Sequence, residues 1–140
     1  MGVLGRLYNN MKIYIAGKFE DRVKISELYK KVKEMGHEVA YDWTDHKPIK
    51  PYPQNQERAQ QYSNNELFGI LDSDIFICLT HEAGTTLLME FGAALILNKK
   101  NGKPLVYVVG DFKDKSPWFF NSGVIRRDSV EEVLTEIRKR

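Results

Sequence analysis

Short apolar segments rich in β-branched and aromatic residues recur along the chain and predict buried β-strands. The five segments are residues 12–16, 37–43, 74–79, 105–109 and 124–127. Apart from Asp74, the segment 74–79 is apolar on both of its faces, which is typical of a strand in a sheet that is covered on both sides. Gly17 and Gly110 follow the first and fourth segments directly and close them.

Between these strands, apolar residues return every three or four positions, which is the spacing of a helix that buries one side. The expected helical ranges are 25–35, 56–71, 86–99 and 130–137. The positions expected to face the core are Ile25, Leu28, Val32, Met35, Ala59, Tyr62, Leu67, Ile70, Leu71, Val130, Val133, Leu134 and Ile137. The range 86–99 is apolar almost all round, so we expect this helix to be buried on most of its circumference.

Strands that alternate with helices of this length indicate right-handed βαβ units and a parallel sheet. We therefore predict a small doubly wound α/β domain of about five strands with helices on both faces of the sheet. Residues 1–10 show no periodicity, so we expect an N-terminal extension there and a single domain over 11–140. Such folds bind ligands at the carboxyl ends of their strands.

Composition narrows the function classes. The 140 residues carry 21 Lys+Arg and 19 Asp+Glu, a balance that argues against a nucleic-acid binder with a basic footprint. No apolar run reaches 18 residues, so no membrane helix is expected. The single cysteine allows no disulfide within the chain, and the three histidines are too scattered for metal-ligand spacing. The glycine-rich loop motifs that bind dinucleotides or nucleoside triphosphates do not occur. We expect a cytoplasmic protein without metal or cofactor.

Glu90 is the most informative residue, because it lies near the start of a helix whose other side chains are almost all apolar. A buried ionised carboxylate is costly unless it is paired or protonated. Glu90 is therefore either a capping or surface residue, favoured by the helix dipole, or a nucleophile or base directed into the site. Tyr14 lies in the first strand and is either a core residue or a hydroxyl partner for Glu90.

The first strand-to-helix turn carries a modest signal for phosphate binding. Lys18 and Arg22 follow Gly17, where backbone N–H groups and a helix N-terminus favour anions. Trp43 ends the second expected strand at the ligand edge. Its ring is suited either to stacking on a base or to packing beneath the following loop.

Three segments together resemble the nucleoside 2-deoxyribosyltransferase superfamily, which includes 2′-deoxynucleoside 5′-phosphate N-hydrolases. They are Ile-Tyr-Ile-Ala-Gly at 13–17, Leu-Asp-Ser-Asp-Ile-Phe-Ile at 71–77 and, above all, Gly-Thr-Thr-Leu-Leu-Met-Glu-Phe-Gly-Ala-Ala-Leu at 84–95. The resemblance implies a flavodoxin-like fold. It also implies an enzyme in which a helix glutamate attacks the anomeric carbon of an N-glycoside, and a base or water resolves the covalent intermediate.

The resemblance assigns roles to individual residues. Glu90 matches the nucleophile, and Tyr14 matches the tyrosine that orients it. Glu66, eight residues before Asp74, stands where the family has an aspartate that helps to protonate the leaving base. Gly84, Thr85 and Thr86 correspond to the Gly-Thr loop that contacts phosphate or sugar. Here Gly84-Thr85 comes two residues earlier than in the family, and the first loop lacks the family's small hydroxyl residues.

Three functions remain open from the sequence. The first is transfer or hydrolysis of the N-glycosidic bond of a (deoxy)nucleoside or its 5′-monophosphate. The second is a non-catalytic nucleotide-binding or signalling module on the same fold. The third, a flavin protein, is disfavoured because the first loop lacks a hydroxyl-rich phosphate cradle. The apolar helix 86–99, with Gly-Ala-Ala at 92–94, and the resemblance both lead us to expect a homodimer or larger assembly.

Overall fold

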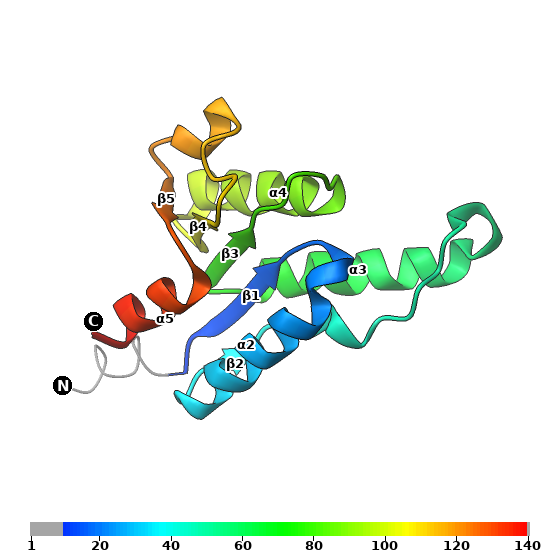
Figure 1. Ribbon diagram of the computed structural model, residues 1–140, viewed down its shortest axis with the longest axis horizontal. Helices are drawn as coiled ribbons and strands as arrows, with labels where there is room; N and C mark the ends of the chain where they lie inside the picture. Colours follow the sequence, from blue (N-terminus) through cyan, green and yellow to red (C-terminus); the bar gives the residue numbers. More distant parts are fainter. Residues whose placement is uncertain (1–9, 140) are drawn as a thin grey trace.

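The computed structural model describes residues 10–139, and the expected extension therefore lies, except for Asn10, outside the described residues. Five parallel strands form one sheet in the order β2-β1-β3-β4-β5 (Figure 1). The strands are β1 Lys12–Ala16, β2 Glu38–Val39, β3 Ile75–Leu79, β4 Leu105–Val109 and β5 Val124–Arg127. This strand order is that of flavodoxin-like proteins, and it confirms the predicted doubly wound α/β fold.

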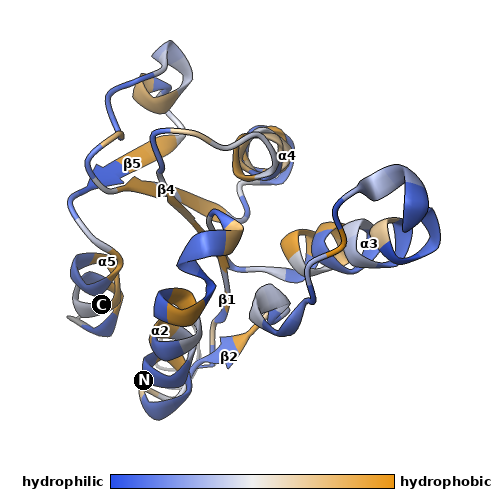
Figure 2. Cartoon of the chain, turned by 45° about the vertical axis from the view of Figure 1, so that its right-hand side comes forward, coloured by the Kyte–Doolittle hydropathy of each residue, from blue (hydrophilic) through white to orange (hydrophobic). Residues whose placement is uncertain are grey.

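Four α-helices cover the sheet on its two sides. They are α2 Arg22–Glu34, α3 Gln56–Asp72, α4 Thr86–Asn101 and α5 Val130–Lys139. α2 and α5 pack together on one face, whereas α3 and α4 pack together on the other (Figure 2). In the described residues no helix is long and apolar enough to span a bilayer.

The face under α2 and α5 follows the predicted pattern closely. Every expected core position of α5 is buried, with Ile137 fully inaccessible. The Ser129 side chain accepts a hydrogen bond from the Glu132 N–H at 3.1 Å, and the Glu132 carboxylate accepts one from the Asp128 N–H at 3.0 Å. These bonds satisfy N–H groups that a helix start leaves without partners, so α5 begins where the sequence indicates.

The second strand is much shorter than predicted. The expected strand 37–43 contains only Glu38–Val39 in the sheet, and the chain then turns into a 3-10 helix at Trp43–Asp45. The Asp42 carboxylate accepts a hydrogen bond from the Thr44 N–H at 2.9 Å. This local cap gives the backbone an alternative to continued strand pairing.

The helices on the other face expose apolar side chains that the periodicity placed inside. In α3, Leu67 is 50% and Leu71 57% exposed, because this end of the helix turns Gly69 and Ile70 toward the sheet, while its other end extends beyond the sheet (Figure 1). In α4, Leu88, Met89 and Ile96 are exposed as well. The expectation that α4 is buried on most of its circumference is therefore wrong for this chain on its own.

Candidate functional site

The site centres on Glu90, which lies in α4 about one turn after the helix begins and is only 8% exposed. Tyr14, in the middle of β1, is fully buried, and its hydroxyl donates a hydrogen bond to Glu90 Oε2. Strand β1 runs under α4, so a tyrosine in the strand reaches a glutamate on the helix above it. The structure thus brings together the two residues that the sequence singled out first.

The electrostatics of the site come from two carboxyl groups in a poorly solvated place. Burial, and after it the negative charge of Glu66, raises the pKa of Glu90 to about 8, and the hydrogen bond from Tyr14 partly opposes this shift. Burial likewise raises the pKa of Glu66, on α3, to about 7. Because two nearby carboxylates repel each other, the pair retains a proton near neutral pH.

The hydrogen bond from Tyr14 favours the ionised form of Glu90, because its hydroxyl can donate to a carboxylate. Tyr14 therefore opposes the effects of burial and of the Glu66 charge on Glu90 but does not cancel them. When the shared proton lies on Glu66, the pair contains an ionised carboxylate and an acid. The pKa of Tyr14 is strongly raised by burial and then by the charge of Glu90, so its hydroxyl keeps its proton.

Gly69 lets α3 pack closely against Tyr14 and Tyr41. A Cβ atom at this position of α3 would lie 2.6 Å from Tyr41 Cβ and 3.1 Å from Tyr14 Cε2. The Tyr14 ring also stacks on Phe76 of β3, with 5.7 Å between ring centroids and 8° between planes. The ring is therefore held between a strand neighbour and the bare backbone of α3, which fixes the direction of its hydroxyl.

The predicted basic residues Lys18 and Arg22 lie at the first loop, and both contact neighbouring residues of this loop. Lys18 Nζ lies 3.2 Å from Glu20 Oε1. The Arg22 guanidinium lies 4.4 Å from the centroid of the Phe19 ring and donates to the Phe19 carbonyl at 3.3 Å. Gly17 is needed for close packing, since a Cβ there would lie 2.4 Å from Ile25 Cδ1.

The loop before α4 lies next to the first loop. Gly84 has φ +146°, a backbone conformation that favours glycine, and a Cβ on it would lie 4.0 Å from Lys18 Cδ. Thr85 precedes α4 and Thr86 begins it, and both are exposed, with no capping hydrogen bond from the Thr85 side chain. Lys18, Gly84 and the helix start therefore form one polar edge above Glu90.

Trp43 is buried, with 5% of its surface exposed, and its indole N–H donates to the Ile15 carbonyl at 2.7 Å. This hydrogen bond joins the turn after β2 to the adjacent strand β1. The burial of the ring favours the packing role that the sequence left open over stacking on a ligand.

Sequence reasoning missed an aromatic cluster that joins the loop after β2 to α3. The Tyr41 hydroxyl lies 2.6 Å from His46 Nε2, and the His46 ring stacks on Tyr62 at 3.7 Å between centroids. Asn65 Nδ2 donates to the Tyr41 hydroxyl at 3.5 Å. The sequence gives one signal for this cluster, namely a histidine in a loop at the ligand edge of the sheet.

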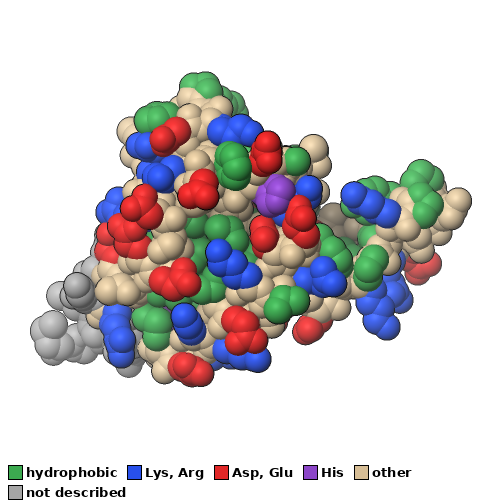
Figure 3. Space-filling view, in the orientation of Figure 1, with side chains coloured by type: hydrophobic (Ala, Val, Ile, Leu, Met, Phe, Trp, Pro, Cys, Tyr) green, Lys and Arg blue, Asp and Glu red, His purple; other side chains and the backbone are tan. Residues whose placement is uncertain are grey.

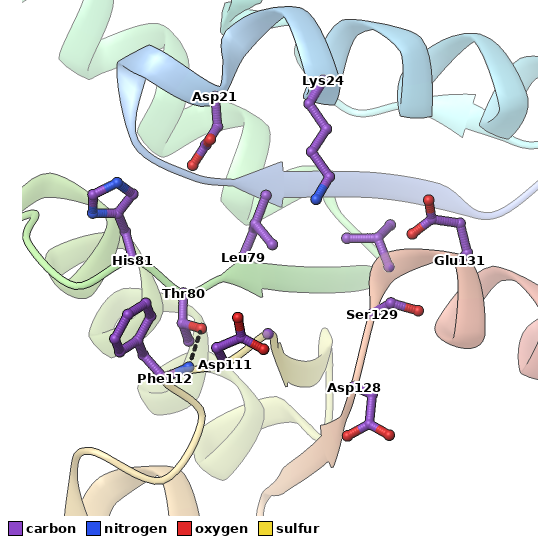
Figure 4. A pocket seen from close by; sticks show the side chains of 12 residues that line it. Asp21, Lys24, Leu79, Thr80, His81, Asp111, Phe112, Asp128, Ser129 and Glu131 are labelled. Atoms are coloured by element: carbon purple, nitrogen blue, oxygen red, sulfur yellow. Dashed lines mark hydrogen bonds between the residues drawn. The ribbon is translucent and has the colours of Figure 1, made fainter.

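Two hollows lie near this edge. A groove of about 320 Å³ is lined by Tyr41, Asn65, Gly69 and their neighbours, so it adjoins the Tyr14–Glu90 cluster through Gly69. A cleft of about 260 Å³ lies at the carboxyl ends of β3 and β4 beside α2 and α5 (Figure 4). Neither Glu90 nor Glu66 lines this cleft, whose charged side chains are mostly carboxylates, with Lys24 among them (Figure 4).

No metal site is built from the described side chains, because no group of three or more histidine, cysteine, aspartate or glutamate residues among them has suitable geometry. Cys78 is a free thiol inside β3, and burial raises its pKa, which keeps the thiol protonated. Acidic and basic side chains are interspersed over the surface in view (Figure 3).

Comparison with known proteins gives one informative likeness. No model of a protein family matches the chain, and no curated protein matches it. Among solved structures, the chain is similar to the CMP N-glycosidase BcmB of Clostridium botulinum, with a TM-score of 0.58 and 14% sequence identity. The match covers 92% of this chain and 99% of that one. At this identity the likeness shows a shared fold over nearly the whole length of both chains.

Proposed function

We propose that the protein cleaves or transfers the N-glycosidic bond of a (deoxy)nucleoside or its 5′-monophosphate through a glycosyl ester on Glu90. One observation carries the proposal: a buried glutamate, at the ligand edge of the sheet, accepts a hydrogen bond from a buried tyrosine. A carboxylate in this setting is costly to the fold unless it is chemically used or strongly paired. The fold shared with a nucleotide N-glycosidase supports the same reaction class.

In the first step, a Glu90 carboxylate oxygen attacks the anomeric carbon of the sugar. The bond between that carbon and the base nitrogen breaks, and its electron pair leaves with the base. Glu66 donates a proton to the departing base, a role that its raised pKa supports. Tyr14 orients the attacking oxygen through its hydrogen bond.

In the second step, water or a second base attacks the same carbon. The ester bond to Glu90 breaks, its electrons return to the carboxylate, and Glu66 accepts the proton of the nucleophile. Lys18, with Gly84, Thr85 and Thr86 on the adjacent loop, forms the edge that receives a 5′-phosphate. Gly17 keeps the first loop close to α2. Arg22 adds positive charge there, and Trp43 supports the floor of the site from within.

Incubation with a panel of deoxynucleosides, ribonucleosides and their monophosphates, scored by release of free base, tests this proposal directly. Glu90→Gln keeps the shape and the partner of the side chain but removes the attacking charge. We expect it to lower base release at least about a thousandfold. A 2-fluoro sugar analogue should add one glycosyl mass to Glu90 in the native protein. Glu82→Gln, on the exposed loop before α4, is the control.

Full base release by Glu90→Gln would overturn the mechanism. The second candidate, a non-catalytic nucleotide-binding module, would then be favoured by the glutamate that stands in place of the family's aspartate at position 66. Nucleotide binding without base release by the native protein would support that alternative.

The proposal includes a homodimer or larger assembly in the cytoplasm. Its support is the apolar surface of the two helices that lie side by side on one face of the sheet. The exposed members are Leu67, Phe68, Leu71, Leu88, Met89 and Ile96. Apolar surface of this kind on neighbouring helices marks an interaction site. Sedimentation at micromolar concentration should show a species larger than the 16.2 kDa chain, and a monomer alone would contradict this part.

A further inference from the structure

One carboxylate oxygen lies between two nitrogen donors at the ligand edge of the sheet. Glu20 Oε1, on the first loop, lies 3.2 Å from Lys18 Nζ and 2.8 Å from His81 Nε2. His81 belongs to the loop that leads from β3 to α4. The Glu20 side chain therefore links the two loops that flank the proposed phosphate edge.

The donors of this arrangement are held in place independently of Glu20. His81 Nδ1 accepts a hydrogen bond from the Ala83 N–H at 2.9 Å, so the neutral ring carries its proton on Nε2, facing Glu20. The Lys18 side chain runs alongside Gly84, where a Cβ would lie 4.0 Å from its Cδ. An ammonium group and an imidazole N–H thus converge on one anionic oxygen.

Lys18 and His81 thus form an anion site, and the Glu20 carboxylate of the same chain occupies it. A phosphate group needs the same kind of donors, and it carries up to two negative charges that Glu20 would repel. The Glu20 side chain is 57% exposed, so it can turn toward water at little cost. The carboxylate is therefore a displaceable competitor and not a permanent structural partner.

We propose that Glu20 is a specificity-determining residue, an internal counter-ion that a substrate phosphate must displace from Lys18 and His81. The inference rests on the proposed function for the identity of the phosphate, which is the 5′-group of a nucleoside monophosphate. Glu20 thereby shifts preference from the monophosphate toward the free nucleoside. Lys18 and His81 together are the donors that recognise the phosphate once Glu20 has moved away.

The first test uses inorganic phosphate as the probe, so it does not depend on catalysis. Glu20→Gln should bind phosphate about fivefold more tightly than the native protein at low ionic strength, as measured by line broadening in phosphorus NMR. Glu82→Gln changes the net charge equally and lies beside His81 on the same exposed loop, so it is the matched control. The gain should disappear when Lys18→Ala is added to Glu20→Gln.

The second test compares kcat/KM for a nucleoside and its 5′-monophosphate. Glu20→Gln should raise the ratio of monophosphate to nucleoside about fivefold, by lowering KM for the monophosphate alone, and added salt should reduce the gain. Equal phosphate binding by the native protein, Glu20→Gln and Glu82→Gln would overturn the inference, even in an active enzyme. Tighter phosphate binding by Glu20→Gln in a protein that releases no base would support the counter-ion while the proposed function failed.

Discussion

The two faces of the sheet are built on opposite patterns. On one face, α5 directs Val133 and Ile137 into the core and Glu131 and Glu132 outward, while Glu136 is partly buried and accepts a hydrogen bond from the Tyr107 hydroxyl at 2.8 Å. On the other, the neighbours Met89 and Glu90 of α4 reverse that order, with the methionine 72% exposed and the glutamate 8% exposed. Both helices pack on the same sheet, α4 over β1, β3 and β4 and α5 beside β5.

The reversal indicates where the chain gives up stability for another purpose. A sequence specifies its fold most strongly when every local choice agrees with the core, and exceptions are expected at functional sites. On the face under α2 and α5, the nearest counterpart is Glu136, which is only partly buried and is paired with Arg127 as well as with the Tyr107 hydroxyl. The face under α3 and α4 combines buried carboxyl groups with exposed apolar residues, which fits a site and an interaction surface on the same side.

The sharpest way to test this contrast is to remove the proposed acid, Glu66, on the face under α3 and α4. Glu66→Gln should reduce base release about a hundredfold for poor leaving groups and much less for good ones, because proton donation matters most when the base leaves reluctantly. Glu57→Gln, at the exposed start of the same helix, should leave the rate unchanged.

The same variant should also move the pH profile. The charge of Glu66 contributes to the raised pKa of Glu90, so its removal lowers that pKa and shifts the acidic limb of base release to lower pH. The alkaline limb, which reports loss of the Glu66 proton, should disappear. A profile with both limbs unmoved would contradict the acid role.

Buried Glu90 should also make stability depend on pH. Its folded-state pKa of about 8 lies above its value in the unfolded chain, so the folded protein binds the extra proton more tightly. The contribution to stability is fully present below about pH 4 and is lost as pH rises toward 8. Between pH 5 and 8, urea unfolding should show the native protein losing on the order of 3–4 kcal/mol relative to Glu90→Gln. A constant difference would show that Glu90 keeps an ordinary pKa.

A pair of isoleucines compares the two faces directly. Ile137→Ala removes a fully buried side chain of α5 and should cost about 3 kcal/mol in the free energy of unfolding. Ile96→Ala, on α4, removes a side chain that is 66% exposed and should cost less than about 0.5 kcal/mol at submicromolar concentration. If Ile96→Ala lowered the free energy of unfolding as much as Ile137→Ala does, and the loss depended on protein concentration, assembly would cover the outer side of α4.

Much of the fold follows from local pattern, whereas the exceptions depend on distant parts of the chain. The stripe of α5 is visible in the sequence because one side of the helix meets the core, and the apolar strands are visible because both faces of the sheet are covered. Periodicity places Leu67 and Leu71 on the inner side of α3, but it does not tell that the side with Gly69 and Ile70 is the one that meets the sheet. The second strand ends early, at Val39, and the Asp42 side chain caps the 3-10 helix that follows, a local alternative that the strand-forming residues Val39 and Tyr41 conceal.

The site divides in the same way. Glu90 stands out from the sequence because a lone charge interrupts an apolar helix. Glu66 emerges only from the spacing implied by the family resemblance, since nothing in the pattern of α3 distinguishes it from its polar neighbours. The stack of His46 on Tyr62 joins a loop to a helix 16 residues away, and no local signal encodes that meeting.

Gly69 has a consequence for anyone who engineers this protein. Glycine inside a helix costs roughly 1 kcal/mol relative to alanine, so a search for heat-tolerant variants would select Gly69→Ala early on. The added methyl group would lie 2.6 Å from Tyr41 Cβ, a separation that real side chains essentially never show, and 3.1 Å from Tyr14 Cε2, a tight contact to which the ring or the helix must yield. Selection for thermal stability at this position would therefore disturb the placement of Tyr14. The glycine keeps the geometry around Tyr14 at the expense of helix stability.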